Sequence, residues 1–210
     1  MESISNTIER KIAGHKSGSV ILPADFRGEG AATAINMALS RLATKGKLRR
    51  LAHGIYYKPQ IHPVFGEQIP APERVAETIA RKDRVHIRPS GMYALHRLGL
   101  TTQVPTKLVY LTDGQRRKIN VGKAQISFKP TTARKMALKG PLSGLVIQAL
   151  EELGTDNLKD EIKEKLKGFL LKEKPDLLKK DLALAPAHIY NFILKLLKDG
   201  YNDRMVRPYR

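Results

Sequence analysis

The sequence predicts an α+β fold in which three parts follow one another along the chain. Residues 1–59 combine helical periodicity with two short runs of β-forming residues, and residues 72–140 add further runs of β-formers. From residue 141 to residue 210 the apolar spacing is helical, and each stretch is bounded by Gly, Pro or Asp. Proline interrupts every regular period in residues 60–71, so this segment is expected to be a linker.

The N-terminal part is expected to begin with two helices. Isoleucines recur every four residues at Ile4, Ile8 and Ile12, which predicts a first helix with one apolar edge. A short second helix is predicted at residues 23–26, because proline is favoured at the first position of a helix.

The longest helix of this part is predicted over residues 31–45. Apolar side chains spaced i, i+3, i+4 and i+7 form a single stripe of Ile35, Ala38, Leu39 and Leu42. The other side carries no carboxylate and consists of Thr33, Asn36, Met37, Ser40, Arg41 and Thr44. Gly46 follows the last periodic residue and is a natural C-terminal stop.

Two strands are predicted after this helix, at residues 48–51 and 55–57, with Gly54 supplying the positive φ of the hairpin turn. Helix, short helix, longer helix and basic hairpin is the order of a winged helix-turn-helix. The second of its paired helices lies in the major groove of DNA. The fold expected for the whole chain is therefore a winged helix-turn-helix, a small α+β domain and a helical C-terminal extension.

The exposed side of the long helix is the candidate surface for reading bases, because Asn pairs bidentately with adenine and Arg with guanine. The candidates for base readout are Thr33, Asn36, Met37, Ser40 and Arg41. The candidates for phosphate contact are Lys45, Lys47, Arg49, Arg50, His53 and Lys58. The alternative is an ordinary amphipathic helix whose polar residues face water. The basic hairpin and the missing carboxylates favour DNA.

The composition indicates a polyanionic partner. Lys and Arg number 38 against 20 Asp and Glu, which gives a net charge of +18. No run of 18 apolar residues is present and the N-terminus lacks the apolar core of a signal peptide, so we expect a cytoplasmic protein without membrane contact. The absence of cysteine excludes disulfides, thiol catalysis and cysteine-ligated zinc.

The middle and C-terminal parts are predicted from the same signals. In the middle part we expect helices at residues 72–81 and 89–98 and strands at residues 85–87, 107–112, 118–121 and 124–128. In the C-terminal part we expect helices at residues 142–153, 158–171, 175–184 and 186–198. Charges of opposite sign spaced i, i+4, such as Glu161 and Lys165, indicate a solvated helix surface.

The middle part is also the most basic. Its candidate anion surface comprises Arg84, Arg88, Arg97, Arg116, Arg117, Lys118 and Lys123, together with His86. Such a surface would provide a second DNA contact or would bind RNA or a nucleotide, and the alternative is a charged surface that only aids solubility. Ser90 and Gly91, at a predicted helix start, would be able to offer free N–H groups to a phosphate.

Over about residues 3–140 the chain resembles the AbiEi family, the antitoxins of bacterial type IV toxin-antitoxin systems. The resemblance is carried by SGSVILPADFRGEGAATAINMALSRLATKGKLRRLAHGIYYKP, then RPSGMYALHRLGL, then KLVYLTDGQRRKINVG. It implies a winged-helix domain that represses its own operon by binding inverted repeats at the promoter, for which two copies would be needed. It also implies a C-terminal domain that counteracts a nucleotidyltransferase toxin, without implying direct contact with that toxin.

Two other classes of function stay open. The first is a general nucleic-acid binding module, for RNA or DNA, without a toxin partner. The second is a basic nuclease, since Arg81 and His86 have the R-x4-H spacing of some helical ribonucleases. The histidines lack metal-binding spacings and no phosphate-binding loop of the Walker type is present. We therefore expect no enzyme activity, no metal and no cofactor.

Overall fold

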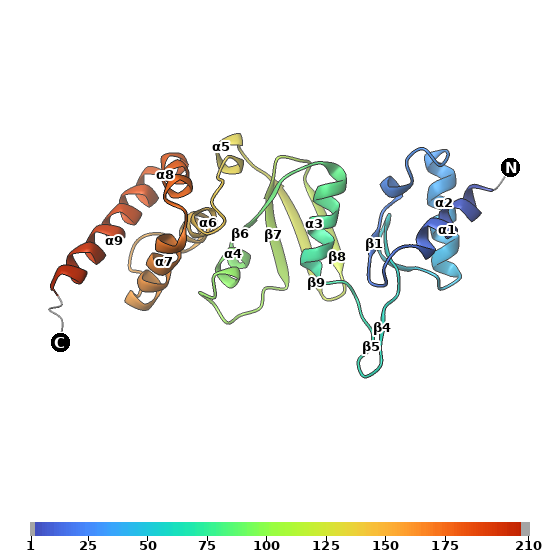
Figure 1. Ribbon diagram of the computed structural model, residues 1–210, viewed down its shortest axis with the longest axis horizontal. Helices are drawn as coiled ribbons and strands as arrows, with labels where there is room; N and C mark the ends of the chain where they lie inside the picture. The colour runs from blue at the N-terminus through green and yellow to red at the C-terminus, as the bar shows by residue number, and fades with distance from the viewer. Residues whose placement is uncertain (1–2, 207–210) are drawn as a thin grey trace. The chain divides into compact units, whose positions relative to one another are not determined.

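The computed structural model describes residues 3–206 and shows an α+β protein (Figure 1). Its helices are α1 (Ile4–Ala13), η1 (Pro23–Phe26), α2 (Ala32–Thr44), α3 (Pro72–Asp83), α4 (Met92–Arg97), α5 (Ala133–Met136), α6 (Ser143–Leu153), α7 (Asp160–Lys172), α8 (Pro175–Leu184) and α9 (Ala187–Val206). Its strands are β1 (Val20–Ile21), β2 (Arg49–Ala52), β3 (Ile55–Tyr57), β4 (Ile61–His62), β5 (Gly66–Glu67), β6 (Ile87–Ser90), β7 (Lys107–Thr112), β8 (Arg117–Val121) and β9 (Ala124–Pro130).

The chain divides into two compact units, each made of two segments. The first unit comprises residues 1–85 and 117–126. The second comprises residues 86–116 and 127–210. Within the described residues, no helix combines the length and the apolar character needed to cross a membrane.

The N-terminal elements of the first unit form one small core, drawn in blue in Figure 1. Helix α1 packs against α2, and β1, β3 and β2 form an antiparallel sheet in that order. The core side chains that they share are Ile8, Ile12, Ile21, Phe26, Ile35, Leu39, Leu42, Leu48 and Tyr56. The helix predicted over residues 31–45 and the hairpin after it are confirmed, whereas the short helix at residues 23–26 is a 3₁₀ helix rather than an α-helix.

Residues 60–71, predicted to be a linker, contain a hairpin that the sequence pattern did not indicate. Strands β4 and β5 pair antiparallel, with Ile61 opposite Glu67 and His62 opposite Gly66. This two-stranded ribbon extends away from the three-stranded sheet (Figure 1). Strands of two residues are too short to show an alternating pattern, and the prolines around them suggested irregular structure.

The strand predicted at residues 85–87 was misplaced. Helix α3 ends at Asp83, and the capping residue Arg84 adopts a left-handed conformation (φ 55°). The Val85 amide donates to the Ala80 carbonyl, so Val85 still belongs to the helix end. Strand β6 then includes Pro89 and Ser90, which were predicted to begin a helix. Proline is tolerated there because β6 is an edge strand, where a missing N–H group costs little.

The larger sheet has the strand order β6-β7-β9-β8. Strands β6 and β7 are antiparallel, with Ser90 opposite Val109 and Arg88 opposite Leu111. The ring of Tyr110, on β7, contacts the rings of Tyr93 and Phe128 at centroid distances of 5.2 and 6.0 Å.

The four helices predicted in the C-terminal part are confirmed as α6 to α9, and α5 was missed. Their apolar faces meet in one core that includes Val146, Ile147, Leu150, Leu166, Leu170, Ile189 and Ile193. On the surface of α7, the Lys165 ammonium donates to the Glu161 carboxylate at 2.8 Å, which confirms the predicted pair.

Candidate functional site

Helix α2 presents all five candidates for base readout to solvent. Thr33, Asn36, Met37, Ser40 and Arg41 are exposed, and Met37 retains 55% of its accessible surface. The apolar stripe on the other side of the helix is buried in the core. Among the described residues, none of the five side chains has a hydrogen-bond or ion-pair partner, so their polar groups are available to a partner molecule.

The predicted phosphate contacts differ in exposure and in the partners that they already have within the protein. Lys45 and His53 are exposed, and the ring nitrogen Nδ1 of His53 lies 3.0 Å from Arg50 Nη2. Lys47 forms an ion pair with Glu9 of α1. Lys58 donates to the carbonyls of Ala13 and His15, both at 2.8 Å, and so satisfies backbone groups at the end of α1. Lys58 therefore has a role in holding the fold that its sequence position did not reveal.

Arg49 is held by the β4–β5 hairpin. Its Nε atom lies 3.1 Å from both carboxylate oxygens of Glu67, and the Tyr57 hydroxyl donates to Glu67 Oε1 at 2.7 Å. The hydrogen bond from Tyr57 lowers the pKa of Glu67, with a further contribution from Arg49. Burial, together with the hydrogen bond to Glu67, raises the pKa of Tyr57 to about 12. A carboxylate thus occupies the position on Arg49 that a phosphate would take.

The basic residues of the middle part do not all behave as surface groups. Arg84, Arg97, Arg116, Lys118 and Lys123 are exposed. Arg97 donates to the Tyr93 hydroxyl at 3.4 Å, and Arg117 is half-buried and paired with Asp83 at 3.5 Å. The first compact unit contains Arg84, Arg117, Lys118 and Lys123, and the second contains Arg88, Arg97 and Arg116.

Arg88 points into the second unit. Burial lowers the pKa of its guanidinium, and the negative charge of Asp181 opposes that shift. A Cβ atom added to Gly144 would lie 2.8 Å from Arg88 Nη1, which shows how closely the guanidinium approaches α6. Arg88, which was predicted on an anion surface, is half-buried and has its guanidinium close to α6.

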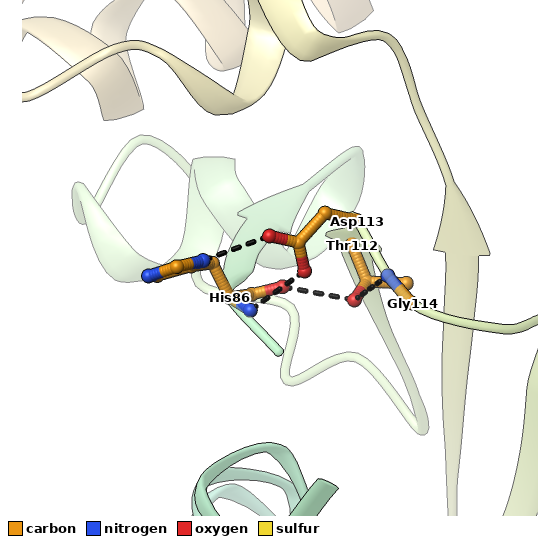
Figure 2. A network of polar contacts seen from close by, with 4 residues as sticks. All are labelled: His86, Thr112, Asp113 and Gly114. Atoms are coloured by element: carbon orange, nitrogen blue, oxygen red, sulfur yellow. Dashed lines mark hydrogen bonds and ion pairs between the residues drawn. The ribbon is translucent and has the colours of Figure 1, made fainter. Parts of the chain in front are cut away.

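His86 and Asp113 form a pair that the spacing argument missed (Figure 2). His86 Nδ1 lies 2.7 Å from Asp113 Oδ2, and the His86 amide donates to Asp113 Oδ1 at 2.8 Å. The buried Thr112 hydroxyl supports the turn by donating to the His86 carbonyl and accepting from the Gly114 amide. The hydrogen bond from His86 lowers the pKa of Asp113. This carboxylate, 27 residues away, is the partner of His86, whereas Arg81 makes no contact with it among the described interactions.

The start of α6 contains a buried polar network. Asp181 has no exposed surface and accepts hydrogen bonds from the Lys139 and Gly140 amides and from the Ser143 hydroxyl, at 2.7, 2.8 and 2.6 Å. Glu173 accepts from the Leu142 and Ser143 amides at 2.8 and 3.0 Å. Burial alone would raise the pKa of Glu173, but these backbone hydrogen bonds lower it.

This network is structural rather than catalytic. Ser143 is completely buried, so its hydroxyl cannot meet a substrate. Within the described part of the chain, no group of three or more His, Asp or Glu side chains is placed to hold a metal ion.

Comparison with known proteins identifies the family. The model of a family of unknown function, DUF6088, matches residues 7–178, and the chain belongs to this family. The fold is similar to the crystal structure of the RV2827C protein from Mycobacterium tuberculosis, with a TM-score of 0.55 and 15% sequence identity over 93% of this chain and 76% of that one. At this identity the similarity concerns the fold alone. No curated protein sequence matches the chain.

Proposed function

We propose that residues 1–59 act as a winged helix-turn-helix that binds double-stranded DNA, and that the protein is an antitoxin that represses its own operon. In this proposal two copies bind inverted repeats at the promoter. The remainder of the chain counteracts a nucleotidyltransferase toxin, as the resemblance to the AbiEi family implies.

One observation carries the DNA-binding proposal. The side of α2 that faces away from the core is exposed, lacks carboxylates and has no internal partners among the described residues. Asn36 and Arg41 are the residue types that read adenine and guanine through paired hydrogen bonds. A helix that served only as a solvated surface would have no need to exclude acidic residues.

The order of elements supports the same proposal. Helix α1, strand β1, helix η1, helix α2 and the β2–β3 hairpin follow one another around one core. In helix-turn-helix proteins the second helix of the pair enters the major groove, and α2 has the corresponding position in the chain. The net charge of +18 supplies the long-range attraction to a polyanion.

The test is a binding titration with the full chain. Fluorescence anisotropy would compare a duplex from the protein's own promoter with a random duplex of the same length, at several salt concentrations. Arg41→Ala should reduce the preference for the promoter by roughly 5- to 150-fold, the cost of one lost base contact. Arg49→Ala combined with Arg50→Ala should weaken both duplexes about equally, because phosphate contacts carry no sequence information.

Lys180→Ala is the matched control, because Lys180 is an exposed cation on α8 of the second unit, without an internal partner among the described residues. It should leave the preference unchanged. Equal losses on both duplexes from Arg41→Ala would argue against base readout. Tight binding without any preference would instead favour the alternative, a general nucleic-acid binding module.

The antitoxin part needs a separate test. A nucleotidyltransferase reading frame next to this one would be expressed with and without the protein, and growth would be measured. Rescue by both the wild type and Arg41→Ala would show that antitoxin activity does not require base readout. Failure of the wild type to rescue growth would contradict the antitoxin proposal while leaving DNA binding untouched.

A further inference from the structure

A cavity of about 430 Å³ lies in the second compact unit, and none of the predicted DNA contacts of residues 1–59 lines it. Strands β6, β7 and β9, the segment after α4 and helix α6 all contribute to its wall. This volume falls in the range of small-molecule sites and is far larger than a single phosphate group needs.

The wall of the cavity has an apolar part and a polar part. Val109 and Leu111 of β7 provide an apolar floor, and Ser90 lies directly opposite Val109 across the antiparallel pair, so both side chains are on the same face of the sheet. Val104, in the segment after α4, adds an apolar side chain that is largely exposed. Apolar surface beside a few polar groups is the usual composition of a ligand site.

Four polar side chains of the cavity wall have no partner in the described part of the chain. Among the described residues, the side chains of Lys107, Lys129, Glu152 and Gln103 make no hydrogen bond or ion pair. Some charged groups of the same unit are paired: Lys135, for example, donates to Glu151, the residue next to Glu152, at 2.7 Å. Two ammonium groups, a carboxylate and an amide therefore line one cavity, each without a partner in the part of the chain that the structure describes.

We infer that this cavity binds a small organic phosphate monoester. The two ammonium groups of Lys107 and Lys129 match the two negative charges of a phosphate monoester, and a carboxylate ligand would neutralise only one of them. The apolar floor accommodates the organic group of the ester, and Gln103 and Glu152 are placed to hydrogen-bond to its hydroxyl or amino substituents. This site does not depend on DNA binding.

The inference is tested by isothermal titration calorimetry on the full chain with three probes: phenyl phosphate, benzoate and inorganic phosphate. Phenyl phosphate should bind at least about tenfold more tightly than either of the others, since only it offers both a dianion and an apolar group. Lys107→Ala and Lys129→Ala should each weaken phenyl phosphate about tenfold or more, the cost of one charge-assisted hydrogen bond.

Lys180→Ala serves as the control for the loss of one positive charge, and the thermal midpoint of each variant checks that it folds. Val104→Asp should also weaken binding without touching either lysine, because it places a like charge beside the ester. Benzoate binding as tightly as phenyl phosphate would overturn the phosphate assignment. Absence of binding by the wild type, or binding that both lysine variants retain in full, would overturn the site itself.

Discussion

Polar side chains on the exposed side of α2 and at the start of α6 differ in burial and in hydrogen bonding. On α2, polar and basic groups such as Asn36 and Arg41 face solvent without partners among the described residues. At the start of α6, Asp181 is fully buried and accepts three hydrogen bonds within the protein. Neutral residues at the exposed positions of α2 would let the protein fold equally well. The hydrogen bonds to Asp181, in contrast, are necessary for the local backbone.

This difference separates residues that hold the fold from residues that are available to a partner. A buried carboxylate is tolerated only when its charge and lone pairs are satisfied, so each donor around Asp181 depends on it. An exposed arginine is hydrated and can be removed at little cost in stability. Substitutions in the two regions should therefore have opposite effects on unfolding and on binding.

The largest effect is expected from Asp181→Ala. The substitution leaves the Lys139 amide, the Gly140 amide and the Ser143 hydroxyl without their acceptor, and it removes the negative charge that faces Arg88. We expect a loss of about 3 kcal/mol or more in the free energy of unfolding, measured by urea denaturation.

Asp156→Ala is the control for this measurement, because Asp156 is exposed and has no partner among the described residues. It should change the free energy of unfolding by less than about 0.5 kcal/mol, and Arg41→Ala should behave in the same way. If Asp181→Ala were as harmless as Asp156→Ala, the contrast between the two regions would be wrong.

The sequence predicts the α2 region well because its determinants are local. The apolar stripe from Ile35 to Leu42 has the period of a helix, and Gly54 marks the turn of the hairpin that follows. The exposure of Asn36 and Arg41 then follows from the same period, without knowledge of any distant contact.

The α6 region is not predictable in this way. Ser143 and Asp181 are 38 residues apart, and nothing in the spacing of either residue identifies the other. The same holds for His86 and Asp113, which are 27 residues apart, and for Arg49 and Glu67, which are 18 apart. Only the tertiary fold brings these groups together, so their roles were missed or assigned differently.

A second prediction tests how tightly the α6 network is packed. A Cβ atom added to Gly140 would lie 1.9 Å from Ser143 Oγ and 2.8 Å from Asp181 Oδ2. Gly140→Ala should therefore lower the free energy of unfolding by about 1–3 kcal/mol, since the hydrogen-bonded groups must move apart. Thermal or urea unfolding of the full chain would measure the change.

Gly168 offers a matched control with the opposite sign. It lies inside α7, and a Cβ atom added there would meet nothing within 4 Å. Gly168→Ala should stabilise the protein by about 0.5–1 kcal/mol, because alanine restricts the unfolded chain more than glycine and favours the helix. Similar effects of the two substitutions would show that the close contacts at Gly140 are not the reason for its residue type.

The smallest effect is expected from Glu67→Gln, and it concerns binding rather than stability. Glu67 is paired with Arg49, one of the candidate phosphate contacts, and an exposed pair of this kind contributes less than about 1 kcal/mol. Removing the carboxylate charge frees the guanidinium and removes a negative charge near the DNA. Under the proposed function, affinity for every duplex should therefore rise a few-fold, and the dependence on salt should steepen by about one phosphate contact.

The double substitution Arg49→Ala with Glu67→Gln separates this cause from a general change in charge. If Glu67 acts by occupying Arg49, the double variant should bind DNA no more tightly than Arg49→Ala alone. If Glu67 only repels DNA through its charge, the double variant should still bind DNA more tightly than Arg49→Ala alone. A wild type that binds no duplex would contradict the proposed function itself, whereas a wild type that binds DNA as tightly as Glu67→Gln would show that Arg49 lies outside the contact surface. These two variants therefore show whether Arg49, on the β2–β3 hairpin, only stabilises the fold or also binds DNA.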